Sequence, residues 1–254
     1  MQTNTMKQKI LNREPAFGLS IMFASPQLVE MAAGCGFDWV LIDCEHGAIS
    51  LESVEVLCMA AKAAGITPIA RPRSKDALEI LQVLDRGALG VQIPHVNTAD
   101  EARAAVKACK FHPDGMRSLA GGTRPQNYDL PAPSTSYYDD ANREILVCVQ
   151  LEDKIAIDNA DEILAVEGID VFFIGPSDLS QTYGHPGNPK AEPVAKAVDE
   201  TLAKIVAAGK APGMPAAAAA VEDVRAKGVL YIYTHVPRLL GSAAADYFKA
   251  TKGG

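Results

Sequence analysis

The 254-residue chain lacks the features that mark membrane, secreted and nucleic-acid-binding proteins. No apolar run approaches the roughly 20 residues that a helix needs to cross a bilayer. The polar segment at residues 1–9 contains no apolar signal core. Acidic residues outnumber basic ones by 31 to 24, giving a net charge of −7, whereas nucleic-acid binding needs a basic face. We therefore expect a cytoplasmic protein that binds neither membrane nor nucleic acid.

Cysteine is scarce, and the five cysteines form no CxxC pair. We expect reduced, buried thiols, as in most cytoplasmic proteins. Cys44 lies among candidate catalytic residues and is an alternative nucleophile, although no activating pair is evident for it. The chain also lacks a His-x-x-x-His pair and a cysteine cluster, so a structural zinc is not indicated.

Short apolar runs alternate with longer helical patterns along the whole chain. Strands are predicted at Phe17–Ile21, Trp39–Ile42, Thr67–Ala70, Gly90–Ile93, Leu146–Leu151, Val171–Ile174, Ala211–Met214 and Val229–Tyr233. Helices are predicted at Pro26–Cys35, Leu51–Ala64, Asp76–Arg86, Ala99–Cys109, Ile155–Ala165, Pro193–Ala208, Ala217–Lys227 and Pro237–Ala250.

About eight βα units in roughly 250 residues predict an α/β fold, a (β/α)8 TIM barrel with residues 1–254 in a single domain. A doubly wound open sheet alternates in the same way, but no G-x-G-x-x-G follows the first strand, so its dinucleotide-binding form loses support. One long connection, about residues 110–143, is typical of a lid, a binding loop or an interface segment.

Polar side chains follow the apolar runs at four predicted strand ends. They are Asp43 and His46 after the second strand, Arg71 after the third, Gln150 and Glu152 at the fifth, and Asp178 after the sixth. In a barrel of this kind the loops after the strands build the active site. The pattern therefore predicts an enzyme with acid, base, cation and carboxylate groups at one rim.

Glu152 and Asp178 suit a hard divalent cation such as Mg²⁺, Mn²⁺ or Co²⁺, with positions left open for an oxygen-rich substrate. Acidic residues at helix starts also complement the helix dipole without any metal. That simpler interpretation does not explain why Gln150 precedes Glu152 by two residues and so points to the same strand face.

Three further features suit an oxo acid. Backbone N–H groups around Gly175 and Ser177, before a predicted helix, would hold a carboxylate. Arg71 offers a bidentate clamp or a positive charge beside an enolate. Asp43 and His46 suit an orienter and base pair, with the carboxylate accepting from one ring nitrogen. For Glu45, a structural salt bridge and a chemical role are both open.

Five ordered motifs resemble the HpcH/HpaI family of class II, metal-dependent 2-oxo-acid aldolases, over about Phe17 to Phe248. The motifs are residues 39–46 (WVLIDCEH), 69–72 (IARP), 149–152 (VQLE), 166–170 (VEGID) and 173–180 (FIGPSDLS). The resemblance implies that Glu152 and Asp178 bind a divalent metal, and that Gln150, Arg71 and the backbone at Gly175 and Ser177 hold the pyruvate-like part of the substrate. It further implies that His46 with Asp43 transfers protons, through a water on the metal.

The implied reaction is reversible retro-aldol cleavage of a 4-hydroxy-2-oxo acid to pyruvate or hydroxypyruvate and an aldehyde, through a metal-stabilised enolate. The resemblance also implies a last helix that packs on a neighbouring subunit, in a dimer-based homo-oligomer that is often a hexamer. Alternatives are oxaloacetate decarboxylation, decarboxylative carbon–carbon bond formation, and a barrel that binds ligand without turnover. A Schiff-base aldolase is disfavoured because no predicted strand contains a lysine.

The chain departs from the family pattern at Arg117-Ser118, Met214-Pro215 and Thr234-His235. We expect all three to lie on the rim that meets the aldehyde half of the substrate. The acceptor aldehyde is therefore the part of the substrate that the resemblance does not specify.

Overall fold

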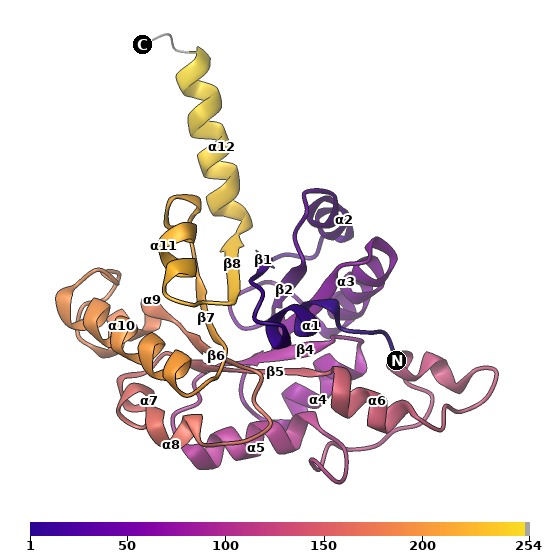
Figure 1. Ribbon diagram of the computed structural model, residues 1–254. Coiled ribbons are helices and arrows are strands. Elements are labelled where there is room, and N and C mark those ends of the chain that lie inside the picture. Colours follow the sequence, from indigo (N-terminus) through magenta and orange to yellow (C-terminus); the bar gives the residue numbers. More distant parts are fainter. Residues whose placement is uncertain (252–254) are drawn as a thin grey trace.

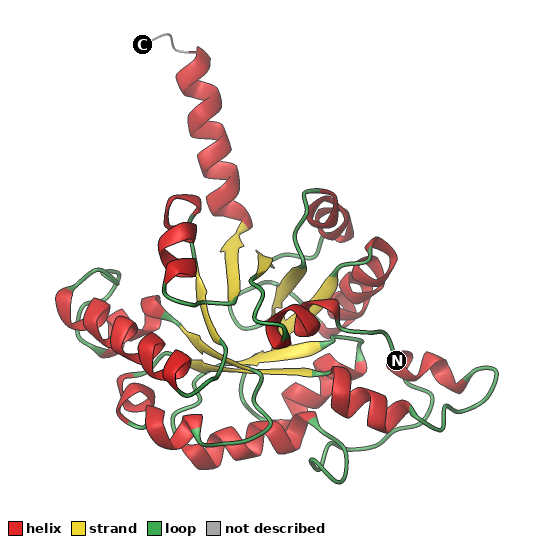
Figure 2. Ribbon diagram, in the orientation of Figure 1, coloured by secondary structure: helices red, strands yellow, loops and turns green. Residues whose placement is uncertain are grey.

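Parallel strands at the centre of the molecule close into a barrel, with helices arranged around it (Figures 1 and 2). The computed structural model describes residues 1–251, so the last residues of the predicted domain, 252–254, lie outside the described residues. The strands pair in the order β1 to β8, and β8 closes the barrel by pairing with β1. Their bounds are β1 Ala16–Ile21, β2 Trp39–Asp43, β3 Thr67–Arg71, β4 Gly90–Ile93, β5 Leu146–Leu151, β6 Val171–Ile174, β7 Pro212–Pro215 and β8 Tyr231–His235. The predicted (β/α)8 barrel is confirmed.

Every predicted helix has a counterpart in the structure. The counterparts are α2 Pro26–Gly34, α3 Leu51–Ala64, α4 Ala77–Asp85, α5 Ala99–Cys109, α7 Lys154–Asp158, α8 Ala160–Leu164, α10 Glu192–Ala207, α11 Val221–Ala226 and α12 Val236–Thr251. The helix predicted at Ile155–Ala165 is divided at Asn159, whose side-chain amide donates to the carbonyl of Asn97. Asparagine often competes with helix hydrogen bonding in this way. Ala218–Ala220 forms a 3₁₀ turn before α11 instead of its first turn.

Three further helices lie in segments where the sequence predicted none or only a helix start: α1 Thr5–Leu11, α6 Tyr137–Glu144 and α9 Pro176–Thr182. The long connection at residues 110–143 also holds a 3₁₀ segment, Arg124–Asp129. Helix α1 covers the amino-terminal end of the barrel, where the Asn4 amide donates to the carbonyl of Leu89 and the Thr5 hydroxyl lies 3.4 Å from that of Thr67. The opposite, carboxyl-terminal end stays free for a site.

Two layers of apolar packing hold the barrel. One layer lies between the strands and the surrounding helices, and the other fills the barrel itself. The inner layer contains the single tryptophan, Trp39, whose ring centroid lies 4.1 Å from that of Tyr231. Gly18 makes room for this indole, because a Cβ at Gly18 would come within 2.2 Å of the ring.

Helix α12 stands away from the rest of the molecule (Figure 1). Leu240 is 68% exposed and Tyr247 is 66% exposed, although both are large apolar side chains. In the part of the chain that the structure describes, no helix is both long enough and apolar enough to cross a membrane.

Candidate active site

The carboxyl ends of β2 and β3 bring the first predicted residues together. Asp43 and Arg71 are register partners at the ends of these neighbouring strands. The Arg71 guanidinium donates from Nε to Oδ1 of Asp43 at 2.9 Å and from Nη2 to Oδ2 at 2.5 Å. Both side chains are buried. Burial alone would raise the pKa of Asp43, but the hydrogen bonds and charge of Arg71 outweigh burial and lower it. The pair is therefore ionised and rigid.

Glu45 links this pair to two histidines. Its Oε2 lies 3.3 Å from Nε of Arg71 and 3.6 Å from Nε2 of His46, and its Oε1 lies 3.6 Å from Nε2 of His95. Burial raises the pKa of Glu45 despite the positive charge of Arg71. Glu45 thus lies at the rim in contact with the buried ion pair and with both histidine rings.

The Asp43 carboxylate was expected to accept a hydrogen bond from the His46 ring, and the structure shows a different contact. Asp43 accepts hydrogen bonds from the backbone N–H groups of Glu45 at 3.1 Å and His46 at 3.2 Å. The His46 ring instead lies beside the Glu45 carboxylate, with its side chain 53% exposed. The reason is that both oxygens of Asp43 already accept from Arg71.

Glu152 is a buried carboxylate with a hydrogen-bond donor at each oxygen. The backbone N–H of His95 donates to Oε1 at 2.9 Å, and the Gln150 amide donates to Oε2. Burial raises the pKa of Glu152 to about 7, and the charge of Asp178 adds to the increase. The two predicted metal ligands are therefore close enough to repel each other.

Gly175 allows the Glu152 side chain to pack closely against the backbone. A Cβ at Gly175 would come within 2.7 Å of the Glu152 Oε2 and 2.8 Å of its Cβ. Gly175 is the N-cap of α9, and Asp178 lies in the first turn of this helix. Ser177 is exposed in the same turn. Its backbone remains at the rim.

The donor set fits a hard divalent cation. Two mutually repelling carboxylates, one of them buried, are stabilised by a cation that accepts oxygen ligands. Among the described residues no group of three or more histidine, cysteine or acidic side chains surrounds a common point. The remaining coordination positions would therefore belong to water or substrate, as in a site that binds a chelating oxo acid.

Sequence reasoning missed three residues of this site. His95 follows β4 in the left-handed region, with φ of 51°, which turns its N–H to Glu152. Its Nδ1 lies 3.0 Å from Asp153. Gln92 and Tyr233 are buried in the barrel below the rim. His95 follows a strand end like the residues that were predicted, and a glutamine inside an apolar strand signals a buried partner.

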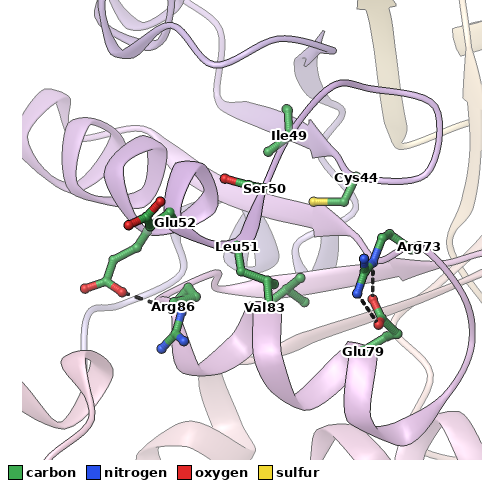
Figure 3. A pocket seen from close by; sticks show the side chains of 10 residues that line it. Cys44, Ile49, Ser50, Leu51, Glu52, Arg73, Glu79, Val83 and Arg86 are labelled. Carbon is green, nitrogen blue, oxygen red and sulfur yellow. Dashed lines mark hydrogen bonds and ion pairs between the residues drawn. The ribbon is translucent and has the colours of Figure 1, made fainter.

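Cys44 lies on the other side of the β2 strand end from Asp43, because successive residues of an extended chain point to opposite faces. Its sulfur points into a cavity of about 580 Å³ between α3 and α4 (Figure 3). Two ion pairs line it, Arg73 with Glu79 and Arg86 with Glu55. Burial raises the pKa of the Cys44 thiol to about 12, so the geometry does not favour it as a nucleophile. The expectation of buried thiols is wrong for Cys35, which is exposed, whereas the other four cysteines are buried.

The expectation that all three departures lie on the rim is wrong for Arg117-Ser118. Arg117 is buried, with Nη2 2.7 Å from Asp85 at the end of α4 and its guanidinium over the Phe111 ring. The segment follows α5 and leads into β5, and such a connection lies at the amino-terminal end of a barrel. Met214-Pro215 and Thr234-His235 end β7 and β8, so these two departures do lie at the rim.

Comparisons with known proteins agree with this geometry. The profile of the HpcH/HpaI aldolase/citrate lyase family matches residues 17–231. A hydroxypyruvate/pyruvate aldolase of Sagittula stellata is 38% identical over 83% of this chain and 82% of that protein. A 4-hydroxy-2-oxo-heptane-1,7-dioate aldolase of Shigella sonnei is 35% identical over 98% of this chain and 95% of that protein.

A solved structure supports the fold independently. An HpcH/HpaI aldolase/citrate lyase family protein from Burkholderia cenocepacia superimposes with a TM-score of 0.92 and 30% identity, covering 99% of this chain and 100% of the other. The resemblance seen in the strand-end motifs is confirmed: the chain belongs to the HpcH/HpaI aldolase/citrate lyase family.

Proposed function

We propose that the protein is a divalent-metal-dependent class II aldolase. It cleaves a 4-hydroxy-2-oxo acid reversibly to pyruvate or hydroxypyruvate and an aldehyde. The observation that carries the proposal is the buried carboxylate of Glu152, which packs against Gly175 at the start of the helix that carries Asp178, at the same barrel mouth as the Arg71–Asp43 pair. The relatives named hydroxypyruvate/pyruvate aldolase and 4-hydroxy-2-oxo-heptane-1,7-dioate aldolase support this class of substrate.

Glu152 and Asp178 would hold the cation, for which Mg²⁺, Mn²⁺ and Co²⁺ are the candidates. When bound, it supplies a Lewis acid that polarises the 2-oxo group and offsets the negative charge of the enolate. The Gln150 amide and the backbone at Gly175 and Ser177 would position the oxo-acid end of the substrate.

Arg71 is oriented for a second electrostatic contact. A guanidinium has five N–H donors in a planar fork, and Asp43 takes one from Nε and one from Nη2. The N–H donors on the other edge of the guanidinium, which includes Nη1, remain for the substrate. They can bind its carboxylate or the enolate oxygen on which negative charge develops. Because Asp43 fixes the plane of the fork, these donors need little reorganisation during the reaction.

His46 is the proposed base of the cleavage direction. Its half-exposed ring lies beside Glu45, so it can take the proton of the 4-hydroxyl group while the carboxylate stabilises the imidazolium that forms. The C3–C4 bond then breaks, the aldehyde carbonyl forms at C4, and the electron pair of that bond becomes the enolate of the oxo acid. Return of the proton to C3 completes pyruvate.

Aldol chemistry is favoured over its rivals. Oxaloacetate decarboxylation passes through the same enolate, but the relatives at 35–38% identity are named aldolases. A barrel that only binds ligand would show no proton exchange at the methyl group of pyruvate. Proton NMR of pyruvate in D₂O with Mg²⁺ separates turnover from binding, and an assay of oxaloacetate beside 4-hydroxy-2-oxo acids separates the two reactions.

The test of the proposal is pyruvate release from a panel of 4-hydroxy-2-oxo acids, measured with a coupled dehydrogenase. EDTA should abolish release, and excess Mg²⁺, Mn²⁺ or Co²⁺ should restore it. Full activity in chelator would contradict the metal requirement. Metal-loaded protein that released neither pyruvate nor hydroxypyruvate from any of these substrates would contradict the aldolase assignment.

A homo-oligomer is part of the proposal. Helix α12 carries Leu240 and Tyr247 seven residues apart on one helical face, both largely exposed. Large apolar side chains exposed together on one face mark a protein–protein contact, so the face is expected to pack on a second copy in a dimer-based assembly such as a hexamer. A cytoplasmic location is also proposed, since the five cysteines are free.

A further inference from the structure

A line of hydrogen bonds crosses the barrel interior and ends at Glu152. The Tyr231 hydroxyl on β8 donates to Oε1 of Gln92 on β4 at 2.9 Å. The Gln92 amide then donates to Oε1 of Gln150 on β5 at 2.7 Å, and the Gln150 amide donates to Oε2 of Glu152. β8 pairs with β7 and β1, so the first of these bonds joins strands that are not neighbours.

All four residues are at most 1% exposed, so no bulk water can replace a missing partner. The Tyr231 ring is fixed by packing against Trp39, at 4.1 Å between centroids, and against Phe173, at 6.1 Å. The hydroxyl therefore starts from a rigid point at the centre of the barrel.

The line has one direction, which is set by the acceptor at its end. The Glu152 carboxylate can only accept when it is ionised, so the direction that suits it is the one in which Tyr231, whose pKa burial raises well above its usual value, keeps its proton and donates it to Oε1 of Gln92. Because Gln92 accepts this proton at its oxygen, its nitrogen must face Gln150. Because Gln150 accepts in turn at its oxygen, its nitrogen must face the carboxylate.

The opposite orientation of Gln150 would place its carbonyl oxygen against Oε2 of Glu152, and two acceptors would then face each other. The direction of the hydrogen bonds thus decides whether Glu152 meets the N–H donor or the carbonyl oxygen of the Gln150 amide. The donor holds the carboxylate in place, and the oxygen would repel it. Its second oxygen is held independently by the backbone N–H of His95. Each oxygen keeps lone pairs free for a cation, but only with Gln150 in the observed orientation.

We propose that Tyr231 and Gln92 are positioning residues for the cation site, acting on Glu152 through the orientation of Gln150. The proposal rests on the proposed role of Glu152 as a metal ligand. Tyr231 touches neither cation nor substrate, and its effect is transmitted along three hydrogen bonds. Partners outside the ligand shell typically change metal affinity about 10- to 100-fold, and we expect about three- to tenfold for these more distant groups.

The test is Mn²⁺ binding, measured from the electron paramagnetic resonance signal of free Mn²⁺, so that activity is not needed as a readout. Tyr231→Phe removes the hydroxyl and keeps the ring packing, and Gln92→Leu removes the middle of the line. Both should weaken Mn²⁺ binding about three- to tenfold relative to the unmodified protein. Tyr137→Phe is the matched control, because Tyr137 is also buried but lies on α6 away from the line.

A double substitution distinguishes positioning from general loosening of the barrel. In a Gln150→Leu background, Tyr231→Phe should have no additional effect on Mn²⁺ affinity, since the connection to Glu152 is already removed. An additive loss would contradict transmission through Gln150. If either single variant unfolds, the double variant Tyr231→Phe with Gln92→Leu is tested in its place. It removes both partners of the buried hydrogen bond and so leaves neither of them unpaired.

The outcomes separate the two proposals. Unmodified protein that failed to bind Mn²⁺ would overturn the metal role of Glu152 and this inference with it. If the unmodified protein binds Mn²⁺ and both Tyr231→Phe and Gln92→Leu bind it equally tightly, the inference is overturned. The proposed function is then left intact.

Discussion

The guanidinium of Arg71 binds both carboxylate oxygens of Asp43, with contacts of 2.9 Å and 2.5 Å at the ends of adjacent strands. This pair fixes the orientation of the positive group before any substrate arrives. Preorganisation of that kind places the electrostatic stabilisation at the oxygen where charge develops. The planar geometry of the Arg71 guanidinium, and not only its charge, should therefore matter for catalysis.

Arg71→Lys tests this relationship. A lysine keeps the charge but has no planar fork and cannot make both contacts with Asp43 while serving the substrate. We expect kcat for pyruvate release to fall about 10²- to 10³-fold, the usual loss for one preorganised contact, with the fold retained by circular dichroism. Arg73→Lys is the matched control, because Arg73 is exposed and paired with Glu79. Unchanged kinetics in Arg71→Lys would show Arg71 to be peripheral.

Gly175→Ala should act on Glu152 without straining the backbone. Gly175 has φ of −99°, which any residue adopts, but an alanine Cβ would come within 2.7 Å of Oε2 of Glu152. The carboxylate must move, so we expect Mn²⁺ binding to weaken at least about tenfold, measured by isothermal titration calorimetry. Gly34→Ala on α2 is the control, since its Cβ meets nothing within 4 Å. Equal affinities in the two variants would count against Glu152 as a ligand.

The raised pKa of Glu152 predicts how pH and metal act together on stability. Its pKa is about 7 in the folded chain against 4.5 for an ordinary glutamate. The folded state thus favours the protonated form, and the contribution of Glu152 to stability is complete below about pH 4.5 and lost as pH rises through 7. A cation replaces the proton, so the increase in Tm on adding Mn²⁺ should be larger at about pH 8 than at about pH 5.5.

Scanning calorimetry with EDTA or Mn²⁺ across this pH range measures the effect. Glu152→Gln has no charge to titrate at this position, so its response to Mn²⁺ should be small and nearly independent of pH. An Mn²⁺ effect in the unmodified protein that stayed constant from about pH 5.5 to 8 would contradict the assignment of this titration to Glu152.

The barrel was predictable from sequence because continuous apolar strands and helix boundaries are local signals. The strand ends then indicated that Asp43, Arg71 and Glu152 lie at one rim as candidate site residues, since parallel strands deliver their last residues there. Contacts between distant segments were not predictable. One example is Asp43, whose carboxylate oxygens both accept from Arg71, so that the His46 ring lies beside Glu45 instead. This arrangement depends on which strands are neighbours and on how far each side chain reaches.

The error at Arg117 has a different cause. The predicted helix Ala99–Cys109 and strand Leu146–Leu151 already place Arg117 in a connection from a helix to a strand, which lies at the amino-terminal end of a barrel. What the sequence does not show is its partner, Asp85 on α4. The line from Tyr231 to Glu152 is the extreme example, since its first bond joins residues 139 positions apart.

Helix α12 provides the last prediction. Leu240→Glu with Tyr247→Glu places two charges on the face that is expected to pack against a second copy, where burying them would be costly. Light scattering after gel filtration should show the mass of the unmodified protein as a multiple of one chain, and the variant should shift toward the mass of a single chain.

Leu11→Glu on α1 is the control, with Leu11 59% exposed, and it should keep the assembly. Because the barrel mouth and its donors lie within one chain, the isolated variant should still bind Mn²⁺. An unmodified protein with the mass of one chain would show that the exposed face of α12 does not hold copies together.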